Sequence, residues 1–270
     1  MNEQPQDPCT RRSFVAAAGT TVGLMAVAGC KSTGKQNTTL ASGTLAHTEG
    51  DDKIRVGLIG CGGRGSGAAG QALKADPGVV LYAMGDAFQD RLESSRTHLS
   101  GTYGDRVDVP KERQFIGFDA YKQVMDSGVD VVILTTPPHF RPEHFKTAVA
   151  AGKHVFMEKP MAVDGPGVLS VLEDAKIARE KNLNIMGGFC WRYNMPNRAC
   201  YERIHDGAIG DITCVHSTYL TAPLGTRPRK DDWSDMEWQL RNWQHFNWLS
   251  GDHIAEQACH AVDKINWAKN

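Results

Sequence analysis

Short apolar runs alternate with helix-length segments between residues 54 and 188. The runs that we interpret as strands cover residues 54–59, 79–84, 129–135, 154–157 and 184–188, with a further strand position at Phe115. Helical spacing predicts helices at residues 66–75, 90–99, 121–127, 143–151 and 166–181. Strands that alternate with helices form parallel sheets, and such strands are apolar on both faces. The pattern therefore predicts an α/β fold in which helices cover both faces of a parallel sheet.

The first apolar run leads directly into a glycine-rich turn at residues 60–65. Gly60, Gly62 and Gly65 match the G-x-G-x-x-G spacing, which allows a tight turn, close approach of the backbone to a pyrophosphate, and close helix packing. The second run is followed by Asp86, which lies about 20 residues after Gly65, where an acidic residue binds the adenosine ribose. Three glycines also fit an ordinary turn, but this context favours a Rossmann dinucleotide-binding domain at residues 53–188.

The same residues bear on the choice of cofactor. A carboxylate at Asp86 would repel the 2′-phosphate of NADP, so the sequence favours NAD. Arg64 in the glycine turn keeps NADP as the alternative. We expect the cofactor to contact Gly60, Gly62, Gly63, Arg64, Gly65 and Asp86.

The first 30 residues contain the features of an export signal in the expected order. Arg11 and Arg12 precede an apolar, small-residue stretch at residues 15–29, which is short for a permanent transmembrane helix. The arginine pair resembles a twin-arginine signal, and residues 27–30 resemble a lipobox that would leave Cys30 lipidated. A tail with an accidental arginine pair is the alternative. We predict an exported, periplasmic or cell-surface protein, anchored to the membrane by lipid.

Residues 31–52 are rich in Ser, Thr, Gly and Asn, a composition typical of a flexible tether. Export of the folded chain would suit a protein that takes up its nucleotide in the cytoplasm and retains it. The signal and the glycine turn therefore support each other.

Charge and cysteine content exclude some function classes. Lys and Arg number 30 against 31 Asp and Glu, and no basic stripe suggests nucleic-acid binding. The seven cysteines include no C-x-x-C pair that would indicate zinc or a redox site. We therefore predict no nucleic-acid partner and no metal.

Several motifs after the third strand occur together in a known family. They are residues 135–139 (Thr-Thr-Pro-Pro-His), His144, residues 150–155 (Ala-Ala-Gly-Lys-His-Val) and residues 158–162 (Glu-Lys-Pro-Met-Ala). In order and spacing they resemble the glucose-fructose oxidoreductase, inositol dehydrogenase and rhizopine-catabolism (Gfo/Idh/MocA) family, over residues 53–270. The resemblance implies that Lys159 binds the substrate hydroxyl beside the nicotinamide. It also implies cofactor contacts from Thr136, Pro137, His139, Glu158 and Lys159.

The resemblance extends to a second cluster, at residues 251–263. His260 aligns with the family's catalytic histidine, and Glu256 stands where most relatives carry Asp. Spacings of three, four and seven predict that His253, Glu256 and His260 share one helical face. Such a face could also bind a metal, but no further cluster supports that interpretation. We therefore assign His260 as the base, Lys159 as the hydroxyl-binding cation, and Glu256 as a positioning group for His260 or a neighbouring hydroxyl.

The family also predicts how the chain continues. Residues 189–270 would begin an α+β substrate domain with a largely antiparallel sheet, opened by residues 210–216, and this domain would be incomplete. Arg192 and Tyr193 are candidate sugar contacts, with packing at the domain interface as the alternative. Four tryptophans could stack on a sugar, with core or interface packing as the default: Trp233, Trp238, Trp243 and Trp248. A complete domain would favour a homo-oligomer formed through its sheet.

These residues predict an oxidoreductase that acts on a secondary hydroxyl of a sugar or polyol with tightly bound NAD. Cleavage of a glycoside through transient oxidation is an alternative within the same family. A noncatalytic lipoprotein that binds a sugar or nucleotide is the alternative from another class. Lys159 and His260 favour the enzyme, because a binding protein would need neither.

Overall fold

The structure is a computed structural model, and the fold is described for residues 53–269. Six strands form one sheet in the order β3-β2-β1-β4-β5-β6, and every neighbouring pair is parallel. The strands are β1 (Ile54–Ile59), β2 (Val79–Asp86), β3 (Gln114–Ile116), β4 (Val131–Leu134), β5 (His154–Met157) and β6 (Ile185–Gly187). This is the strand order of a dinucleotide-binding Rossmann domain, so the predicted α/β class is confirmed.

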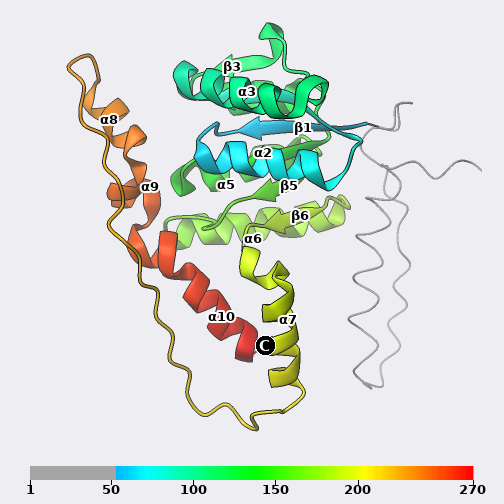
Figure 1. The fold of residues 1–270 in the computed structure, drawn as a ribbon, viewed down its shortest axis with the longest axis vertical. Helices are drawn as coiled ribbons and strands as arrows, with labels where there is room; N and C mark the ends of the chain where they lie inside the picture. Colours follow the sequence, from blue (N-terminus) through cyan, green and yellow to red (C-terminus); the bar gives the residue numbers. More distant parts are fainter. Residues whose placement is uncertain (1–52, 270) are drawn as a thin grey trace, which may run out of the picture.

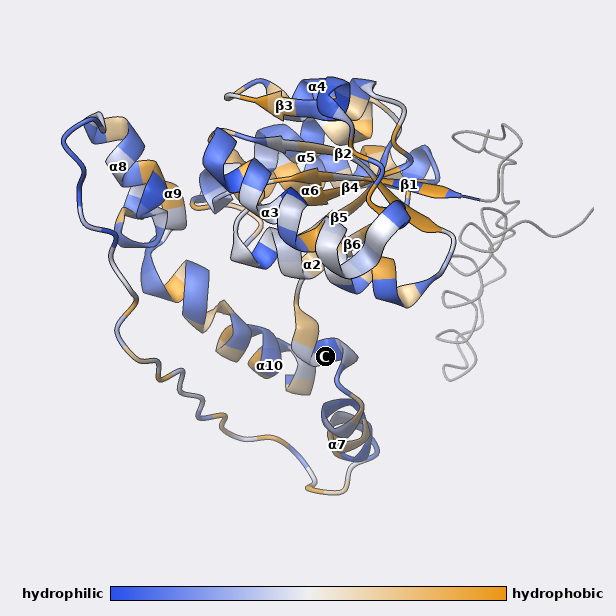
Figure 2. Ribbon diagram, turned by 45° about the horizontal axis from the view of Figure 1, so that its top comes forward, coloured by the Kyte–Doolittle hydropathy of each residue, from blue (hydrophilic) through white to orange (hydrophobic). Residues whose placement is uncertain are grey.

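Helices cover both faces of the sheet (Figure 1). One face packs against α2 (Gly63–Ala75) and α3 (Gln89–Tyr103). The other face lies under α4 (Ala120–Asp126) and α5 (Arg141–Ala150), and α6 (Gly165–Glu180) packs beside α5. Successive strand residues point to opposite faces, and Leu58 and Ile59 accordingly belong to the two separate buried clusters. Figure 2 shows the resulting apolar strands enclosed by helices with polar outer surfaces.

The predicted helices and strands of this domain are all present, with shifted ends. The largest shift at a helix start is in α2, which begins at Gly63 instead of residue 66. Gly62 precedes it in an extended conformation (φ −69°, ψ −178°), so the helix starts within the glycine turn itself. Three short 3-10 helices complete the connections, at η1 (Gly104–Arg106), η2 (Lys111–Arg113) and η3 (Pro138–Phe140).

Residues 189–269 are helical or irregular. They form η4 (Cys190–Tyr193), α7 (Met195–His205), α8 (Asp235–Arg241), η5 (Trp243–His245), α9 (Asn247–Ser250), a π-helical stretch η6 (Ile254–Ala258) and α10 (Cys259–Lys269). Tyr201 of α7 stacks on Trp267 of α10 with ring centroids 4.0 Å apart. A long irregular connection, residues 211–230, runs from α7 to α8 along the outside of the molecule (Figure 1).

The predicted antiparallel sheet is wrong for the part of the chain that the structure describes. Within residues 53–269 the parallel sheet is the only one, and residues 210–216, expected to open a second sheet, contain no strand. A strand needs a neighbour for its backbone hydrogen bonds, and this segment has none beside it. Leu220 in the same connection is 92% exposed. Homo-oligomerisation through such a sheet stays a prediction.

The export signal at residues 1–30, with its lipobox and Cys30, and the tether at residues 31–52 lie outside the described residues. Across residues 53–269, no helix has both the length and the apolar character needed to cross a membrane.

Candidate active site

The glycine turn packs against the end of β4 with no room for side chains. Gly60 has φ +95°, and a Cβ there would lie 2.6 Å from the backbone nitrogen of Thr136. A Cβ on Gly65 would lie 1.9 Å from the carbonyl oxygen of Gly60. The hydroxyl of Thr135 donates to that carbonyl at 2.6 Å and thereby ties the turn to β4. Glycine is therefore required at both positions by the close approach of backbone to backbone.

A cavity of about 310 Å³ lies above this turn, at the carboxyl ends of the strands. Unlike the buried glycines, Gly62 and Gly63 have open space where a Cβ would be, with no heavy atom within 4 Å. No side chain caps the start of α2, so its first backbone N–H groups face this space. The cavity is lined by eight of the predicted cofactor residues: Gly60, Gly62, Gly63, Arg64, Gly65, Asp86, Thr136 and Pro137.

These features fit a bound dinucleotide. The open backbone at Gly62 and the free helix N-terminus suit a pyrophosphate. Asp86 accepts hydrogen bonds from the backbone of Cys61 at 2.6 Å and of Phe88 at 2.9 Å, which fix its carboxyl group in the cavity wall. Burial raises the pKa of Asp86, while these two hydrogen bonds oppose that shift. The carboxyl group lies where the adenosine ribose binds in this fold.

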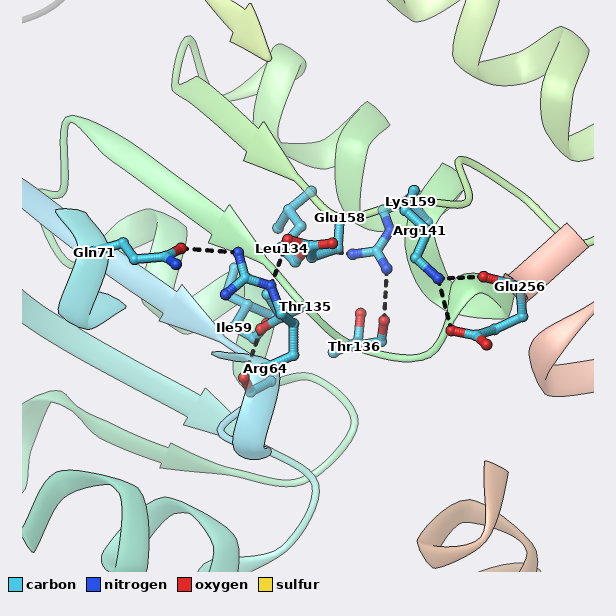
Figure 3. Close-up of polar contacts among 11 residues, drawn as sticks. Ile59, Arg64, Gln71, Leu134, Thr135, Thr136, Arg141, Glu158, Lys159 and Glu256 are labelled. Carbon is cyan, nitrogen blue, oxygen red and sulfur yellow. Dashed lines mark hydrogen bonds and ion pairs between the residues drawn. The ribbon is translucent and has the colours of Figure 1, made fainter. Parts of the chain in front are cut away.

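Three predicted cofactor residues do not line this cavity: Glu158, His139 and Lys159. Glu158 receives a hydrogen bond and ion pair from Arg64, with Nε and Oε1 2.7 Å apart. The same guanidinium donates to Gln71 at 3.2 Å (Figure 3). The ring of His139 stands edge-on to Trp248, with centroids 5.2 Å apart. Cofactor contact by Glu158, His139 and Lys159 stays a prediction.

Lys159, directly after β5, reaches the segment that precedes α10 (Figure 3). Its ammonium group lies 2.9 Å from Oε1 of Glu256 and also donates to the backbone carbonyl of Glu256. Both side chains are largely buried, with relative exposures of 14% for Lys159 and 9% for Glu256. The structure thus joins Lys159 and Glu256, which are 97 residues apart, in one ion pair.

His260 is buried beside this pair. Burial lowers its pKa, and the nearby positive charge of Lys159 lowers it further. Phe189 approaches the imidazole edge-on with centroids 6.1 Å apart, and Tyr219 stacks on it at 6.0 Å. Among the described residues, Nδ1 of His260 and Oε2 of Glu256 are buried and make no hydrogen bond. Such unsatisfied groups each cost about 1–3 kcal/mol, so this cluster suits a polar ligand that would satisfy them.

His253 does not join the buried pair of Glu256 and His260. Its side chain is exposed, and its ring lies 6.4 Å from Tyr219. The prediction that all three share one helical face assumed α-helical spacing, whereas residues 254–258 form a π-helix with more residues per turn. Within residues 53–269, no group of three or more His, Cys, Asp and Glu side chains is placed to hold a metal ion.

The two candidate sugar contacts lie on η4. Arg192 binds both carboxylate oxygens of Asp263, at 2.9 and 3.0 Å, and its guanidinium lies over Trp267. These contacts hold η4 against α10, within residues 189–269 and not across the expected domain interface. Tyr193 is 56% exposed. A sugar contact by either residue stays a prediction.

Sequence reasoning missed several residues that shape the cavity. Phe88 and Arg91 line it directly after Asp86, so the rule that ligands bind beyond strand ends could have identified them. Arg141 is buried and donates to the carbonyls of Leu134 and Thr136, which fixes the end of β4. Of the distant wall formed by Leu240, Arg241, Trp243 and Gln244, the sequence singled out only Trp243, and with packing as its default role.

His144 forms another buried part of the cavity wall. It stacks on Tyr121 with centroids 4.1 Å apart, and its Nδ1 lies 3.2 Å from the hydroxyl of Thr136. Burial, assisted by the charge of Arg141, lowers the pKa of His144 to about 3. The imidazole is therefore neutral in the folded protein at physiological pH.

This shift predicts acid sensitivity. Below pH ~6.5 the unfolded chain binds a proton at His144 that the folded chain does not bind, and this favours unfolding. The stability associated with the neutral imidazole is therefore fully present at neutral pH and is lost progressively as the pH falls toward 3. We expect His144 to lower the free energy of unfolding by about 2 kcal/mol between pH 7 and pH 5. Urea unfolding at both pH values should show that loss reduced in His144→Phe and retained in the exposed control His98→Phe. An unchanged loss in His144→Phe would contradict the assignment.

Comparison with known proteins agrees with this geometry. Residues 54–189 match the GFO_IDH_MocA family model, described as an oxidoreductase family with an NAD-binding Rossmann fold. Among curated relatives, inositol 2-dehydrogenase 4 of Saccharopolyspora erythraea is 29% identical over 75% of this chain and 55% of its own length. A glycosyl hydrolase family 109 protein of Streptomyces coelicolor is also 29% identical, over 62% of this chain and 34% of its own. This chain thus spans between a third and just over half of these relatives.

Solved structures share the fold. A levoglucosan dehydrogenase in complex with NADH and levoglucosan superposes with a TM-score of 0.61 at 23% identity, covering 80% of this chain and 54% of the other. Scyllo-inositol dehydrogenase from Lactobacillus casei, with bound NAD(H) and scyllo-inositol, gives 0.59 at 24% identity over 80% and 56%. With the glycine turn, the cavity and the family match over half of its length, this chain belongs to the GFO_IDH_MocA family of NAD-binding oxidoreductases.

Proposed function

We propose that this protein is an NAD(P)-dependent oxidoreductase that transfers a hydride between a secondary hydroxyl of a sugar or polyol and a tightly bound nicotinamide. The observation that carries the proposal is the buried cluster of Lys159, Glu256 and His260, in which two polar atoms have no partner among the described residues. Relatives named inositol 2-dehydrogenase support a polyol or sugar as the substrate class.

The chemistry requires that the hydroxyl lose its proton as a hydride leaves the same carbon. The bound nicotinamide would supply the hydride acceptor. His260 is the base, and its lowered pKa keeps the imidazole neutral, and able to accept a proton, at lower pH than an exposed histidine. Lys159 would bind the hydroxyl oxygen and stabilise the negative charge that develops on it.

The structure refines the role of Glu256. We expected it to position His260 or a neighbouring hydroxyl, and its observed contact is with Lys159. We therefore infer that Glu256 directs the ammonium group of Lys159, while its unpaired Oε2 remains able to accept a hydrogen bond from a second substrate hydroxyl.

NAD is the proposed cofactor. Asp86 places a carboxyl group in the cavity wall where NADP would bring a phosphate. Arg64, which kept NADP as the alternative, is already paired with Glu158. The family includes NAD-binding members by its description.

Glycoside cleavage is the second candidate, because relatives named glycosyl hydrolase family 109 match this chain at 28–29% identity. The same base and cation would serve an oxidation that is later reversed, after the glycosidic bond breaks. Net reduction of bound cofactor separates this outcome from simple dehydrogenation.

The test uses the full chain, purified without added nucleotide. We expect NAD to be released on denaturation. We also expect a panel of polyols, sugars and glycosides to include a compound that reduces the bound cofactor, which absorbance detects, or one that is cleaved without net reduction, which product mass detects. A folded preparation that binds neither NAD nor NADP would overturn the proposal.

We further propose that the protein is exported by the twin-arginine route and anchored through Cys30, on the order of features at residues 11–30. Replacing Arg11 and Arg12 by Lys should leave precursor in the cytoplasm, and Cys30→Ala should release soluble protein. Cell fractionation followed by immunoblotting measures both effects. An unaltered protein found soluble in the cytoplasm would contradict this localisation.

A further inference from the structure

Residues 235–250, which we call the strap, cross the mouth of the dinucleotide cavity. The strap comprises α8, η5 and α9, and it lies beyond the carboxyl ends of the strands (Figure 1). Four of its residues line the cavity together with the glycine turn: Leu240, Arg241, Trp243 and Gln244. It lies outside residues 54–189, the part that matches the Rossmann family model.

The strap is fixed at both sides of the cavity. At one side, the guanidinium of Arg241 binds both carboxylate oxygens of Asp90 on α3, at 2.9 and 3.0 Å. The same group lies 4.0 Å from the ring centroid of Phe88. At the other side, α9 packs against η3, and Trp248 meets His139 edge-on. The strap therefore bridges the end of β2 and the end of β4.

The contact of Arg241 with Asp90 is made by a buried guanidinium whose hydrogen bonds are satisfied. The side chain of Arg241 is only 8% exposed although it is charged, and all three of its nitrogens donate, with Nε bound to Glu237 at 2.8 Å. Bidentate pairing of arginine with a carboxylate is stronger and more directional than a single surface ion pair. Asn242, also buried, binds the backbone of Arg227 and braces the strap from behind.

The position of this contact identifies which part of a ligand it covers. Asp86 and Phe88 stand at the end of β2, where the adenosine ribose binds in a Rossmann domain. Leu240, Arg241 and Trp243 face the same cavity from the strap. The strap and the β2 end therefore enclose the adenosine half of a dinucleotide between them.

We propose that Arg241 is a positioning residue that fastens the strap over the adenosine half of the dinucleotide and so slows its dissociation. This rests on the proposed function only in requiring that NAD binds. Because the strap comes from outside the Rossmann domain, it would give this chain a means to retain cofactor that the glycine turn alone does not provide. Retention suits an exported enzyme that must keep the nucleotide it acquired before export.

The test compares Arg241→Gln and Asp90→Asn with Glu237→Gln as the matched control in the full chain. Glu237→Gln removes a neighbour of Arg241 on α8 and leaves the Arg241–Asp90 contact in place. Stopped-flow displacement of NADH by excess NAD, followed by NADH fluorescence, gives the dissociation rate constant. We expect an increase of about tenfold for Arg241→Gln and Asp90→Asn, and less than about twofold for the control, because a broken charged pair acts mainly on dissociation.

A second measurement separates the strap from general loosening of the fold. AMP should bind about tenfold more weakly to Arg241→Gln, whereas nicotinamide mononucleotide, which lacks the adenosine half, should bind as it does to the unaltered protein. Equal weakening of both fragments, or a wild-type dissociation rate in both variants, would overturn the proposal. If the unaltered protein binds no NADH, the proposed function itself fails, and the strap proposal with it.

Discussion

Replacing His260 or Lys159 by Ala should lower the rate of cofactor reduction by about two to four powers of ten, the usual contribution of a positioned acid–base group. In the proposed mechanism the two side chains act on one hydroxyl, His260 as the proton acceptor and Lys159 as a fixed positive charge. His260 is buried and the side chain of Lys159 is only 14% exposed, so water replaces neither function readily. Single-turnover reduction of bound NAD, followed at 25 °C with the substrate found by the panel, measures the effect.

Two further variants test which interaction accounts for the expected loss of rate. Glu256→Gln keeps the size of the side chain but removes the charge that holds the ammonium group of Lys159, so we expect a smaller fall of about tenfold to a hundredfold. His98→Ala changes an exposed histidine on α3 and should leave the rate unchanged. Cofactor content, measured after denaturation, should stay at the wild-type level in all four variants, because none of these residues lines the cavity.

Near-normal reduction by His260→Ala would reject His260 as the base. The pH dependence of the rate gives a second test, because a purely structural role of His260 would leave it unchanged. The rate should fall as pH drops through the pKa of His260, which burial and Lys159 place below the ordinary histidine value. Removal of Lys159 takes away one of the two causes, so Lys159→Ala should shift this fall toward higher pH.

The Rossmann domain was predictable from the sequence because its signals are local. Most strands are short apolar runs, and the glycine turn directly follows the first, whereas β3 was predicted only as a single position at Phe115. The close approaches at Gly60 and Gly65 are the physical cause of the glycine spacing, so the spacing alone predicts the shape of the turn. Eight of the predicted cofactor residues accordingly line one cavity.

The remaining features depend on contacts between distant parts of the chain. Asp90 and Arg241 are 151 residues apart, and neither belongs to a recognisable motif. The π-helical stretch before α10 changes which residues share a face, and no periodicity announces it. The expected second sheet failed for a related reason, since residues 210–216 have suitable composition but no neighbouring strand to pair with among residues 53–269. Local pattern fixes neither partner nor register in such cases.

Gly62 and Gly65 both line the cavity, but they should respond to substitution in different ways, because only Gly62 has room for a methyl group. A methyl group at Gly65 would fall 1.9 Å from the carbonyl of Gly60, and backbone on both sides must then move. We expect Gly65→Ala to destabilise the fold by about 1–3 kcal/mol and to abolish cofactor binding. Gly101→Ala, at an exposed position of α3 with open space around it, serves as the control and should be neutral or slightly stabilising.

Gly62→Ala is the more discriminating change. Its backbone conformation suits alanine, and a methyl group there meets no heavy atom of the protein within 4 Å, so thermal unfolding of the ligand-free protein should be unaltered. The methyl group would instead occupy space at the start of α2 that a pyrophosphate needs. We expect the Kd for NAD, measured by calorimetry, to rise about tenfold to a hundredfold, which corresponds to about 1.4–2.8 kcal/mol of binding free energy. Unchanged affinity in Gly62→Ala would place the phosphates elsewhere, whereas a lowered melting temperature without ligand would mean that this space belongs to the protein's own packing. The combination of normal stability and weakened binding is the result that only a ligand over the glycine turn explains.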